Sequence, residues 1–405
     1  MNREMTEFTA KEWIWDHAFT RNRVGRIGAE LEWLVVRTDA SEARVGAAEV
    51  AAIMDSPMPG LGYVSFEAGG QVELSTAPAG SLTACLDATA RDVEFLRSAA
   101  AHSGLSLVGR GLDDRPAARV VDTPRYAELE QSYNRYGPHG RIMMCNSASV
   151  QVNVDAGDAS LGWRGWRRRW WLANCLGPVF TAMFANSPVD SGASGYCGRQ
   201  LLRFRTDPTR TDPLPLTGDP RTRWTDYVLD ARVVGVAEPS ADLTLRGWLR
   251  GSGPRPVFLS DLRRHLKSVI PPVRPRGYLE LRMIDAQAGD NWVVPMVMVS
   301  ALLDDARASE RAAEIVESML WPVRKDDWVT AAHDAMDDPR LAGAALQCMA
   351  AAIGAMERLS VPAWARSVMH QFADVYTFRA RSPAAEHNLG GIPCPTSGEL
   401  SSALR

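Results

Sequence analysis

The chain has 405 residues, of which 46% are hydrophobic and 23% charged, the composition of an ordinary soluble globular protein. Its 45 basic and 48 acidic residues leave a net charge of −3, which argues against a polyanion-binding surface spread over the whole molecule. Six scattered cysteines include no C-x-x-C pair, so we expect neither a zinc site nor disulfides, and we expect a cytoplasmic location. The most apolar window, 341–356, is too short and too weakly apolar to span a membrane.

Strands and helices are predicted in turn over the first 155 residues. Alternating side chains indicate strands, and apolar positions recurring every three or four residues indicate helices. The spacing of Thr9 and Glu12 is that of a capping box, and Ser81 is placed to cap the longest helix. The predicted strands are 26–37, 63–66, 71–75, 105–108 and 149–155, and the predicted helices begin near 9, 45, 81 and 124.

Two of these strands flank a pair of glycines, Gly69 and Gly70, that lies between Glu67 and Glu73. An unbroken strand would point both carboxylates the same way, because their separation is even, and a bulge at the glycines would re-aim one of them. Taken alone, two acids on a sheet face favour a solvated surface over a divalent-cation site. Other parts of the chain are needed to decide between the two.

The strand at 149–155 alternates valines with hydrogen-bonding side chains, which predicts a core face and an opposite polar face. For a single strand a solvated polar face is the more common meaning. Here, however, four strands carry polar groups at even spacing. These groups are Glu30 with Glu32, Glu67 with Glu73, Gln151 with Asn153, and Glu280 with Arg282.

A helix rich in tryptophan and arginine is predicted within 161–185. Interleaved arginines and aromatic rings could indicate nucleic-acid or membrane binding. However, Trp163, Trp166 and Trp170 form one helical stripe with most arginines elsewhere, which favours a core-facing stripe and an outer basic face. We therefore expect neither nucleic acid nor membrane as a partner.

The second half of the chain becomes progressively helical. Ser, Gly, Pro, Asp and Thr predict two loops in 186–223 around one ordered piece at 199–205. A short helix at 261–268 and a strand at 278–286 follow, and helices are predicted from 291 to 378.

The predicted fold class is α+β with a mainly antiparallel sheet, because the strands do not alternate regularly with helices of crossover length. One domain is expected over 1–383, with the helical segment 291–380 packed on it. Residues 384–405, rich in Gly, Pro and Ser, are expected to form a flexible tail.

Most familiar catalytic motifs are missing from the sequence. It has no G-x-x-x-x-G-K-[ST] loop, no G-x-S-x-G and no H-E-x-x-H, and its seven histidines are isolated. Oxygen ligands without His or Cys suit Mg²⁺ or Mn²⁺. An arginine beside such acids could contact a phosphoryl group held by those cations, so the pattern indicates phosphoryl transfer.

Four segments together resemble glutamate–cysteine ligases of the plant and proteobacterial type. They are Gly-Ala-Glu-Leu-Glu at 28–32, Glu-Ala-Gly-Gly-Gln-Val-Glu at 67–73, Ser-Val-Gln-Val-Asn-Val-Asp at 149–155 and Pro-Arg-Gly-Tyr-Leu-Glu-Leu-Arg at 275–282. Within that family the sequence is most similar to the actinobacterial enzymes of ergothioneine biosynthesis. The resemblance runs in order from about residue 10 to 380 and leaves the tail uncovered.

The resemblance implies a fold like the catalytic domain of glutamine synthetase, with a curved sheet forming a funnel and helices packed outside. It implies ATP as co-substrate and two or three Mg²⁺ ions, with Mn²⁺ as an alternative. The implied metal ligands are Glu30, Glu32, Glu67, Glu73 and Glu280, with Asn153 as a weaker candidate.

The resemblance also implies roles for other residues. Arg282 and Glu67 are the expected catalytic residues. The expected substrate-binding residues are Arg199, with Arg210 as second choice, for the glutamate carboxylate, Gln151 for the nucleotide or metal layer, and Tyr136 and Trp292 for pocket walls.

The predicted activity is ATP-dependent ligation of the γ-carboxylate of L-glutamate to the amine of L-cysteine through a γ-glutamyl phosphate. The product would be γ-glutamylcysteine, for ergothioneine biosynthesis, and the enzyme would be a monomer or weak homo-oligomer. Two alternatives remain open: a ligase of the same fold with another amine acceptor, and a catalytically silent ligand-binding homologue.

Overall fold

A seven-stranded sheet forms the centre of the structure, a computed structural model that describes residues 3–19, 25–39, 42–51, 53, 57–189, 195–236 and 242–387. The strand order is β2-β3-β1-β5-β7-β6, and β4 pairs with the other half of β1. Every pairing between these strands is antiparallel, which confirms the predicted class. The strands are β1 (Ile27–Arg37), β2 (Tyr63–Phe66), β3 (Val72–Ser75), β4 (Leu105–Val108), β5 (Ser149–Asp155), β6 (Val273–Pro275) and β7 (Tyr278–Asp285).

The register of the sheet brings the predicted polar rows side by side. Residues directly opposite one another on neighbouring strands share a face, so polar positions two apart on each strand build one polar face. The opposed pairs are Glu32 with Glu73, Glu30 with Gln151, and Asn153 with Glu280.

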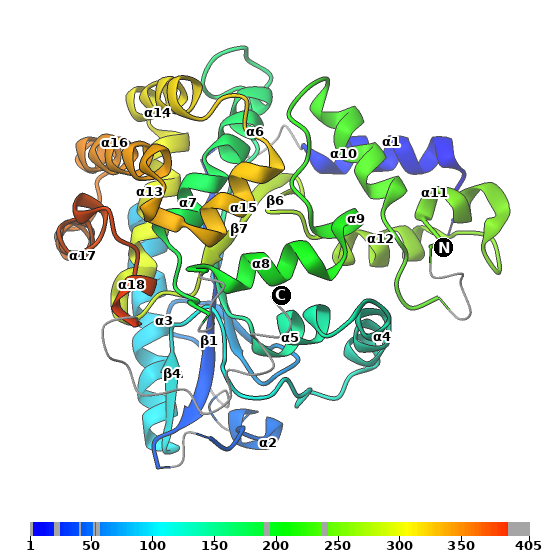
Figure 1. Ribbon diagram of the computed structural model, residues 1–405, viewed down its shortest axis with the longest axis horizontal. Helices are drawn as coiled ribbons and strands as arrows, with labels where there is room; N and C mark the ends of the chain where they lie inside the picture. The colour runs from blue at the N-terminus through cyan, green and yellow to red at the C-terminus, as the bar shows by residue number, and fades with distance from the viewer. Residues whose placement is uncertain are drawn as a thin grey trace.

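Helices cover the apolar face of the sheet in two layers. Leu31, Val150, Val152, Leu279 and Leu281 are at most 2% exposed and pack under the inner helices. Figure 1 shows the second layer stacked outside the first, on the side away from α5 and α8. The inner helices are α3 (Leu82–His102), α7 (Gly177–Met183) and α13 (Val293–Asp304), and the outer ones are α14 (Ala306–Met319), α16 (Pro339–Ala355) and α17 (Ala363–Val375).

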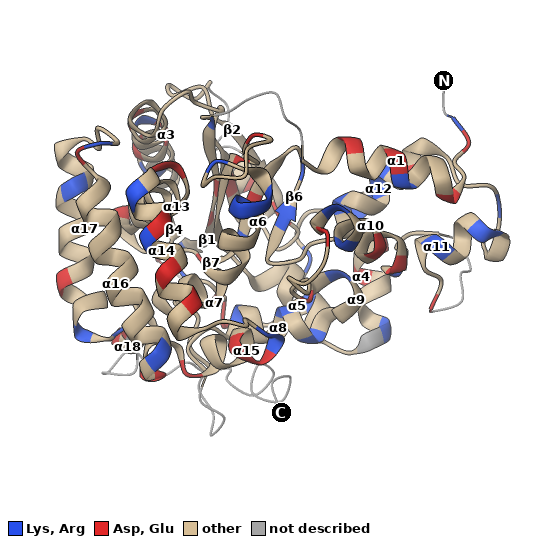
Figure 2. Cartoon of the chain, turned by 90° about the horizontal axis from the view of Figure 1, so that it is seen from above, with Lys and Arg blue, Asp and Glu red and all other residues tan. Residues whose placement is uncertain are grey.

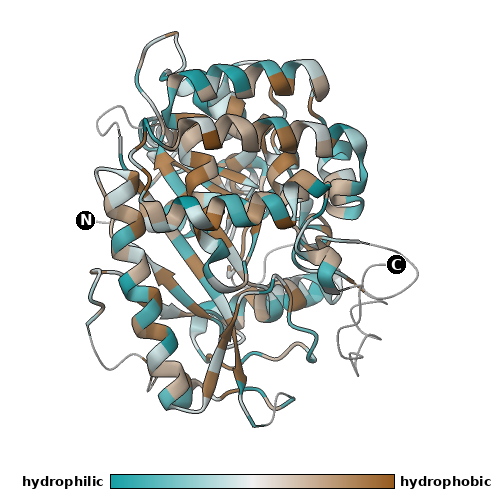
Figure 3. Ribbon diagram, turned by 90° about the vertical axis from the view of Figure 1, so that its left-hand side faces the viewer, coloured by the Kyte–Doolittle hydropathy of each residue, from teal (hydrophilic) through white to brown (hydrophobic). Residues whose placement is uncertain are grey.

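The helices on the other side of the sheet are shorter, and α4, α5 and α8 lie near its polar face (Figure 1). Figure 3 shows the hydropathy that accompanies this division, with brown apolar segments on the strands and on the helices that cover them. The remaining helices are α1 (Glu7–Ala18), α2 (Ala47–Ala51), α4 (Pro124–Tyr133), α5 (His139–Asn146), α6 (Trp166–Cys175), α8 (Gly198–Thr206), α9 (Pro208–Thr211), α10 (Pro220–Asp230), α11 (Leu245–Gly247), α12 (Leu259–Ser268), α15 (Lys325–His333) and α18 (Ala384–His387). Short turns are η2 (Asn134–Tyr136), η3 (Trp248–Ser252), η4 (Gly289–Trp292), η5 (Ala335–Asp337) and η6 (Thr377–Arg379).

Several predicted boundaries were wrong. The first helix begins at Glu7, because Thr6 and Thr9 cap one another reciprocally, so Thr9 lies inside the helix. The single helix predicted from about 161 to 185 is divided into α6 and α7 at Leu176, because Pro178 cannot donate a backbone hydrogen bond to the preceding turn. The predicted loop before residue 223 contains the start of α10, which Asp219 caps.

The predicted tryptophan stripe faces the core at two of its three positions. Trp166 and Trp170 are 4% and 3% exposed, whereas Trp163 precedes α6 and is only half-buried. Arg169, on the same helix, is also buried and forms ion pairs with Asp155 and Asp304, so not every arginine of this segment lies outside. Figure 2 shows basic and acidic residues interspersed along the helices, which agrees with the near-neutral net charge.

The packed structure extends beyond residue 383. Ala384 is fully buried, and its backbone nitrogen donates to the Ala185 oxygen at 2.9 Å, so α18 belongs to the fold rather than to the predicted tail. Residues 388–405, the rest of that predicted tail, lie outside the described part of the chain.

Candidate active site

The structure brings Glu32, Glu67 and Glu73 close enough for their charges to act on one another. Glu32 lies on β1 and Glu73 opposite it on β3, whereas Glu67 begins the turn between β2 and β3. We call these three side chains, together with Glu30, the acidic wall. All four were predicted to share a site, and the antiparallel pairing of β1 with β3 is what gathers them.

Glu32 is the most deeply held member of the acidic wall. One of its oxygens accepts from the Ser149 nitrogen at 2.8 Å and the Ser149 hydroxyl at 3.0 Å, and the other accepts from Gln151 Nε2 at 2.9 Å. Burial, with the nearby charges of Glu73 and Glu67, raises the pKa of Glu32 to about 8. The carboxylate is therefore fixed in position and short of positive charge.

Glu73 and Glu67 are held by hydroxyl groups. Glu73 Oε1 accepts from Ser65 Oγ at 3.1 Å and Ser75 Oγ at 3.3 Å, and Glu67 Oε2 accepts from Tyr126 Oη at 3.0 Å. Burial and the charge of Glu67 raise the pKa of Glu73. Neutral hydroxyl donors orient these acids without neutralising them, which leaves room for a cation.

A tight turn positions Glu67. Its backbone nitrogen donates to the Gln71 oxygen at 2.9 Å, and the Gly70 nitrogen donates back to the Glu67 oxygen at 2.9 Å. Gly70 has φ +87°, a conformation that favours glycine, and a Cβ on Gly69 would lie 1.8 Å from the Cys145 oxygen. The glycine pair thus forms a hairpin turn packed against α5.

Glu280 is neutralised by arginines rather than by open solvent. It is fully buried, and its two oxygens accept from Arg274 at 2.5 and 2.9 Å, from Arg276 at 3.0 Å and from Arg282 at 2.9 Å. Burial opposes its ionisation most strongly, but Arg274 and Arg282 hold its pKa well below the usual value. Among the predicted metal ligands, Glu280 is therefore the one whose charge is already matched.

Arg282 connects Glu280 to the acidic wall. Its Nη1 donates to both Glu280 and the Gln151 oxygen, and Gln151 in turn donates to Glu32. Burial disfavours its charge, but Glu280 and Glu30 raise the pKa of Arg282 above the usual value. Its Nε is buried and has no hydrogen-bond partner among the described residues, so a fixed cation with an unused donor lies beside the carboxylates.

Glu30 and Asn153 are the least engaged of the predicted ligands. The side chain of Glu30 forms no hydrogen bond or ion pair with any described residue, and burial together with the charge of Glu280 raises its pKa. Asn153 Oδ1 is buried and has no hydrogen-bond partner in the part of the chain that the structure describes. Both offer oxygen atoms to a ligand.

The two arginines predicted to bind a substrate carboxylate have different surroundings. Arg199, at the start of α8, donates from Nε to Asp285 at 2.7 Å and from Nη2 to the Arg282 oxygen at 3.1 Å, which places it beside the wall. Arg210 is fixed by an ion pair with Asp207 at 3.0 Å, and its guanidinium lies over the Tyr133 ring. The structure does not bring Arg210 to the acidic wall.

Of the two predicted pocket-wall residues, Trp292 does not join the site. Trp292 is buried with the helices of the apolar face, and its ring centroid lies 6.2 Å from that of Trp364 on α17. An apolar ring at the start of α13 is stabilised more by that core than by a polar face. The side chain of Tyr136 lies outside what the structure describes.

Sequence reasoning missed several residues that hold the site together. Arg203 follows Arg199 by one helical turn, a spacing that could have indicated a shared helix face. Arg274 precedes β7 on the neighbouring strand β6, and no local pattern reveals its bonds to Glu280. The missed residues are Ser65, Tyr126, Ser149, Arg203, Arg274, Arg276 and Asp285.

The donor atoms of the acidic wall suit a hard divalent cation. They are carboxylate oxygens, and the amide oxygen of Asn153 lies on the same face. Burial and neighbouring carboxylates raise the pKa of Glu30, Glu32 and Glu73, as expected where no cation balances their charge. In the described part of the chain, no three His, Cys, Asp or Glu side chains already converge as a metal cluster. The chemistry of the wall fits the cation, whereas its oxygens are still spread among hydroxyl and amide partners.

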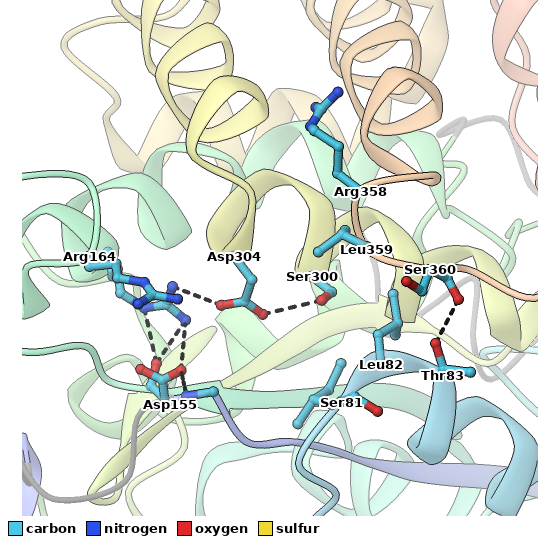
Figure 4. A pocket seen from close by; sticks show the side chains of 13 residues that line it. Ser81, Leu82, Thr83, Asp155, Arg164, Ser300, Asp304, Arg358, Leu359 and Ser360 are labelled. Atoms are coloured by element: carbon cyan, nitrogen blue, oxygen red, sulfur yellow. Dashed lines mark hydrogen bonds and ion pairs between the residues drawn. The ribbon is translucent and has the colours of Figure 1, made fainter.

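A separate pocket of about 420 Å³ lies at the other end of the strands, where α3 begins and α13 ends. Figure 4 shows Asp304 bonded to Ser300 across it and Thr83 bonded to the backbone of Ser360. Arg169 is paired with Asp155 and Asp304, so the charges at its base are satisfied. None of the wall residues lines this pocket.

An antiparallel sheet that presents clustered carboxylates beside fixed arginines defines an enzyme that brings anionic substrates and cations together, such as an ATP-dependent carboxylate–amine ligase. The family model for "Glutamate-cysteine ligase family 2(GCS2)" matches residues 26–370. The chain belongs to this family. It is an ATP-using ligase with the activity predicted above, the joining of glutamate to cysteine.

Two curated relatives illustrate the range of the family. The chain is 36% identical over 385 residues to the glutamate–cysteine ligase EgtA of Mycobacterium tuberculosis, covering 88% of this chain and 87% of that one. It is 30% identical over 267 residues to the chloroplastic glutamate–cysteine ligase of Arabidopsis thaliana, covering 60% of this chain and 49% of the plant protein. The predicted resemblance to both groups is confirmed.

A solved structure shares the fold. A bifunctional glutathione synthetase from Pasteurella multocida superposes with a TM-score of 0.50 at 13% identity, over 99% of this chain and 54% of that one. At this identity the likeness concerns the fold alone. No helix in the part of the chain that the structure describes is long and apolar enough to cross a membrane.

Proposed function

We propose that the polar face of the sheet is the ligase site, where the γ-carboxylate of L-glutamate is activated by ATP and then joined to the amine of L-cysteine. The observation that carries this proposal is a buried acidic wall, in which the pKa of Glu32 is raised to about 8, beside Arg282 with an unused buried donor. The carboxylates can bind cations, and the fixed guanidinium can bind an anionic phosphoryl group. Phosphoryl transfer uses this arrangement.

Mg²⁺ is the cation we assign to the acidic wall. Glu32, Glu67 and Glu73 would hold it, with Glu30 and the unpaired Asn153 oxygen as further donors. Bound there, it supplies positive charge for the phosphates of ATP. Glu280, predicted as a ligand too, supports the site mainly by holding Arg282.

Arg282 stabilises the charge on the transferring phosphoryl oxygens. Its guanidinium is kept protonated by Glu280 and is fixed by Gln151, so it needs no rearrangement during the reaction. The γ-carboxylate oxygen attacks the terminal phosphorus and ADP leaves. The cysteine nitrogen then attacks the carbonyl carbon of the γ-glutamyl phosphate, phosphate leaves, and the amine loses a proton.

Arg199 would bind the carboxylate of glutamate that does not react. It is the buried arginine beside the wall, and its Nη1 forms no hydrogen bond with any described residue. Arg210 is a poorer candidate because the partners that hold it, Asp207 and the Tyr133 ring, do not belong to the wall. Similarity to EgtA supports a place for the product in ergothioneine biosynthesis, within the cytoplasm.

An omission assay tests this function. Phosphate release from ATP by the purified protein should require Mg²⁺, L-glutamate and L-cysteine together, and γ-glutamylcysteine should accumulate in equal amount. Equal release with other amino acids in place of cysteine would assign a different amine acceptor. No release under any combination would show a binding protein that has lost catalysis.

A further inference from the structure

A register shift on β7 turns Asp285 toward the polar face. Asn153 pairs with Glu280, but on the far side of an irregularity between Val150 and Val152, Ser149 pairs with Asp285. In a regular strand Glu280 and Asp285 would point to opposite faces, because they are an odd number of residues apart. The extra residue restores both to one side of the sheet.

The Asp285 carboxylate bonds both to the loop after α7 and to helix α8. It is 1% exposed, and its Oδ2 accepts from the Asn186 nitrogen at 2.8 Å and the Ser187 hydroxyl at 2.6 Å. Its Oδ1 accepts from Arg199 Nε at 2.7 Å, and the Cys197 thiol lies 3.3 and 3.4 Å from the two oxygens. Both oxygens are therefore filled by donors.

These bonds leave Arg199 with one orientation. Its Nε is bonded to Asp285 and its Nη2 to the Arg282 backbone oxygen, both on β7. Only Nη1 has no hydrogen-bond partner among the described residues. The charge of Arg199 also lowers the pKa of Glu32, so the guanidinium lies within electrostatic range of the acidic wall.

We propose that Asp285 is a positioning residue for substrate binding, which fixes the Arg199 guanidinium so that Nη1 can bind the free carboxylate of an amino-acid substrate. This inference rests on the proposed function, in which that substrate is L-glutamate. Asp285 touches no substrate and acts only through Arg199. A preorganised guanidinium binds a carboxylate more tightly because fewer side-chain conformations are lost on binding.

The variant Asp285→Asn removes the negative charge of the side chain while keeping its size and shape. Asparagine has the same size, which matters because a Cβ on Gly111 would lie only 2.6 Å from the Asp285 Cγ. However, one of its two terminal atoms is a donor. That atom must face either Arg199 Nε or the Asn186 nitrogen, so one donor loses its acceptor in either orientation.

The test measures binding of L-glutamate by isothermal titration calorimetry, in the presence of Mg²⁺ and a non-hydrolysable ATP analogue. We expect Asp285→Asn to raise the Kd for glutamate by about 10-fold to 100-fold while the Kd for the ATP analogue changes less than about 3-fold. Arg199→Met should weaken glutamate binding by at least as much. The double variant should bind no more weakly than Arg199→Met, because Asp285 acts only through Arg199.

One control excludes a merely structural role. Asp207→Asn weakens the equivalent buried pair with Arg210. It should bind glutamate like the unmodified protein. An additive double variant, or a control that matches Asp285→Asn, would overturn the inference. If Asp285→Asn does not fold, Arg199→Lys, which keeps the charge but loses the fixed orientation, must show the same selective rise in Kd.

Failure of the proposed function would look different. A protein that binds glutamate but makes no γ-glutamylcysteine contradicts the ligase assignment and leaves the variants to decide the role of Asp285. A protein that binds no glutamate at all overturns the present inference.

Discussion

The carboxylates of the site differ in whether an arginine pairs with them, and this difference indicates which of them support the fold and which can bind a ligand. Among the described residues, the Glu280 carboxylate accepts only from arginines, whereas the Glu30 side chain has no hydrogen bond or ion pair. A buried ion pair that loses one partner leaves the other charge unmatched, which is costly. Removing a carboxylate that has no partner breaks no ion pair, so in the absence of ligands the folded protein should lose little stability.

The first prediction compares these two acids. Glu280→Gln should lower the free energy of unfolding by about 3–5 kcal/mol, because Arg274 and Arg282 lose their buried counter-charge. Glu30→Gln is the matched control and should change stability by less than about 1 kcal/mol while reducing ligase activity. Urea denaturation of both variants measures this, and equal destabilisation would contradict the distinction.

The second prediction concerns Arg282. Arg282→Lys keeps a positive charge but cannot donate to Glu280 and Gln151 with the geometry of a guanidinium. We expect kcat to fall by about 10²-fold to 10³-fold, as when one charge-stabilising donor is removed from an active site. Steady-state kinetics measure it, with circular dichroism confirming the fold. A variant with nearly normal kcat would exclude Arg282 from phosphoryl transfer.

At the scale of elements, the hairpin between β2 and β3 is the most constrained part of the site. The β2–β3 turn must carry Glu67 past the backbone of α5 and return to place Glu73 opposite Glu32. Gly69 allows the close approach to Cys145, and Gly70 provides the positive φ. The position of Glu67 in the acidic wall therefore depends on how closely the turn packs against α5.

The third prediction tests this constraint. Gly69→Ala should destabilise the protein by about 1–3 kcal/mol, because its Cβ would collide with the backbone of Cys145, and it should weaken Mg²⁺-dependent activity. Gly80→Ala is the control, since a Cβ there meets no atom within 4 Å. Thermal denaturation and Mg²⁺ titration of activity measure both effects. Normal activity in Gly69→Ala would show that the turn does not position Glu67.

For the whole molecule, the acidic wall makes stability depend on pH and on cations. The folded-state pKa of Glu32, raised to about 8 from 4.5, means that folding favours its protonated form. Its contribution to stability is therefore fully present below about pH 4.5 and is lost as the pH rises through about 8. A bound divalent cation reverses this penalty by stabilising the ionised form.

The fourth prediction follows from that linkage. In the presence of a chelator, the free energy of unfolding should decrease between about pH 5 and pH 8, and it should decrease less in Glu32→Gln. Added Mg²⁺ should raise Tm more at about pH 8 than at about pH 5. Differential scanning calorimetry at both pH values checks this. Equal Mg²⁺ effects at both, or no difference in the variant, would count against cation binding at Glu32.

Much of the site could be predicted from the sequence, because side-chain direction along a strand is a local property. The spacing of two placed Glu30 with Glu32 and Gln151 with Asn153 on single faces, and the motifs identified the family before any geometry was known. The helices of the C-terminal third also followed from local periodicity. These features depend on residues only a few positions apart.

Only the tertiary structure decided what each charged group does. Arg274 neutralises Glu280 from a neighbouring strand, Arg210 is occupied by Asp207, and Trp292 belongs to the apolar core. Asp285 reaches the polar face only because β7 shifts its register against β5. Whether a carboxylate is free to bind a metal cation or is already paired with an arginine depends on residues distant in the chain. Strand pairing and packing, rather than local pattern, bring those residues together.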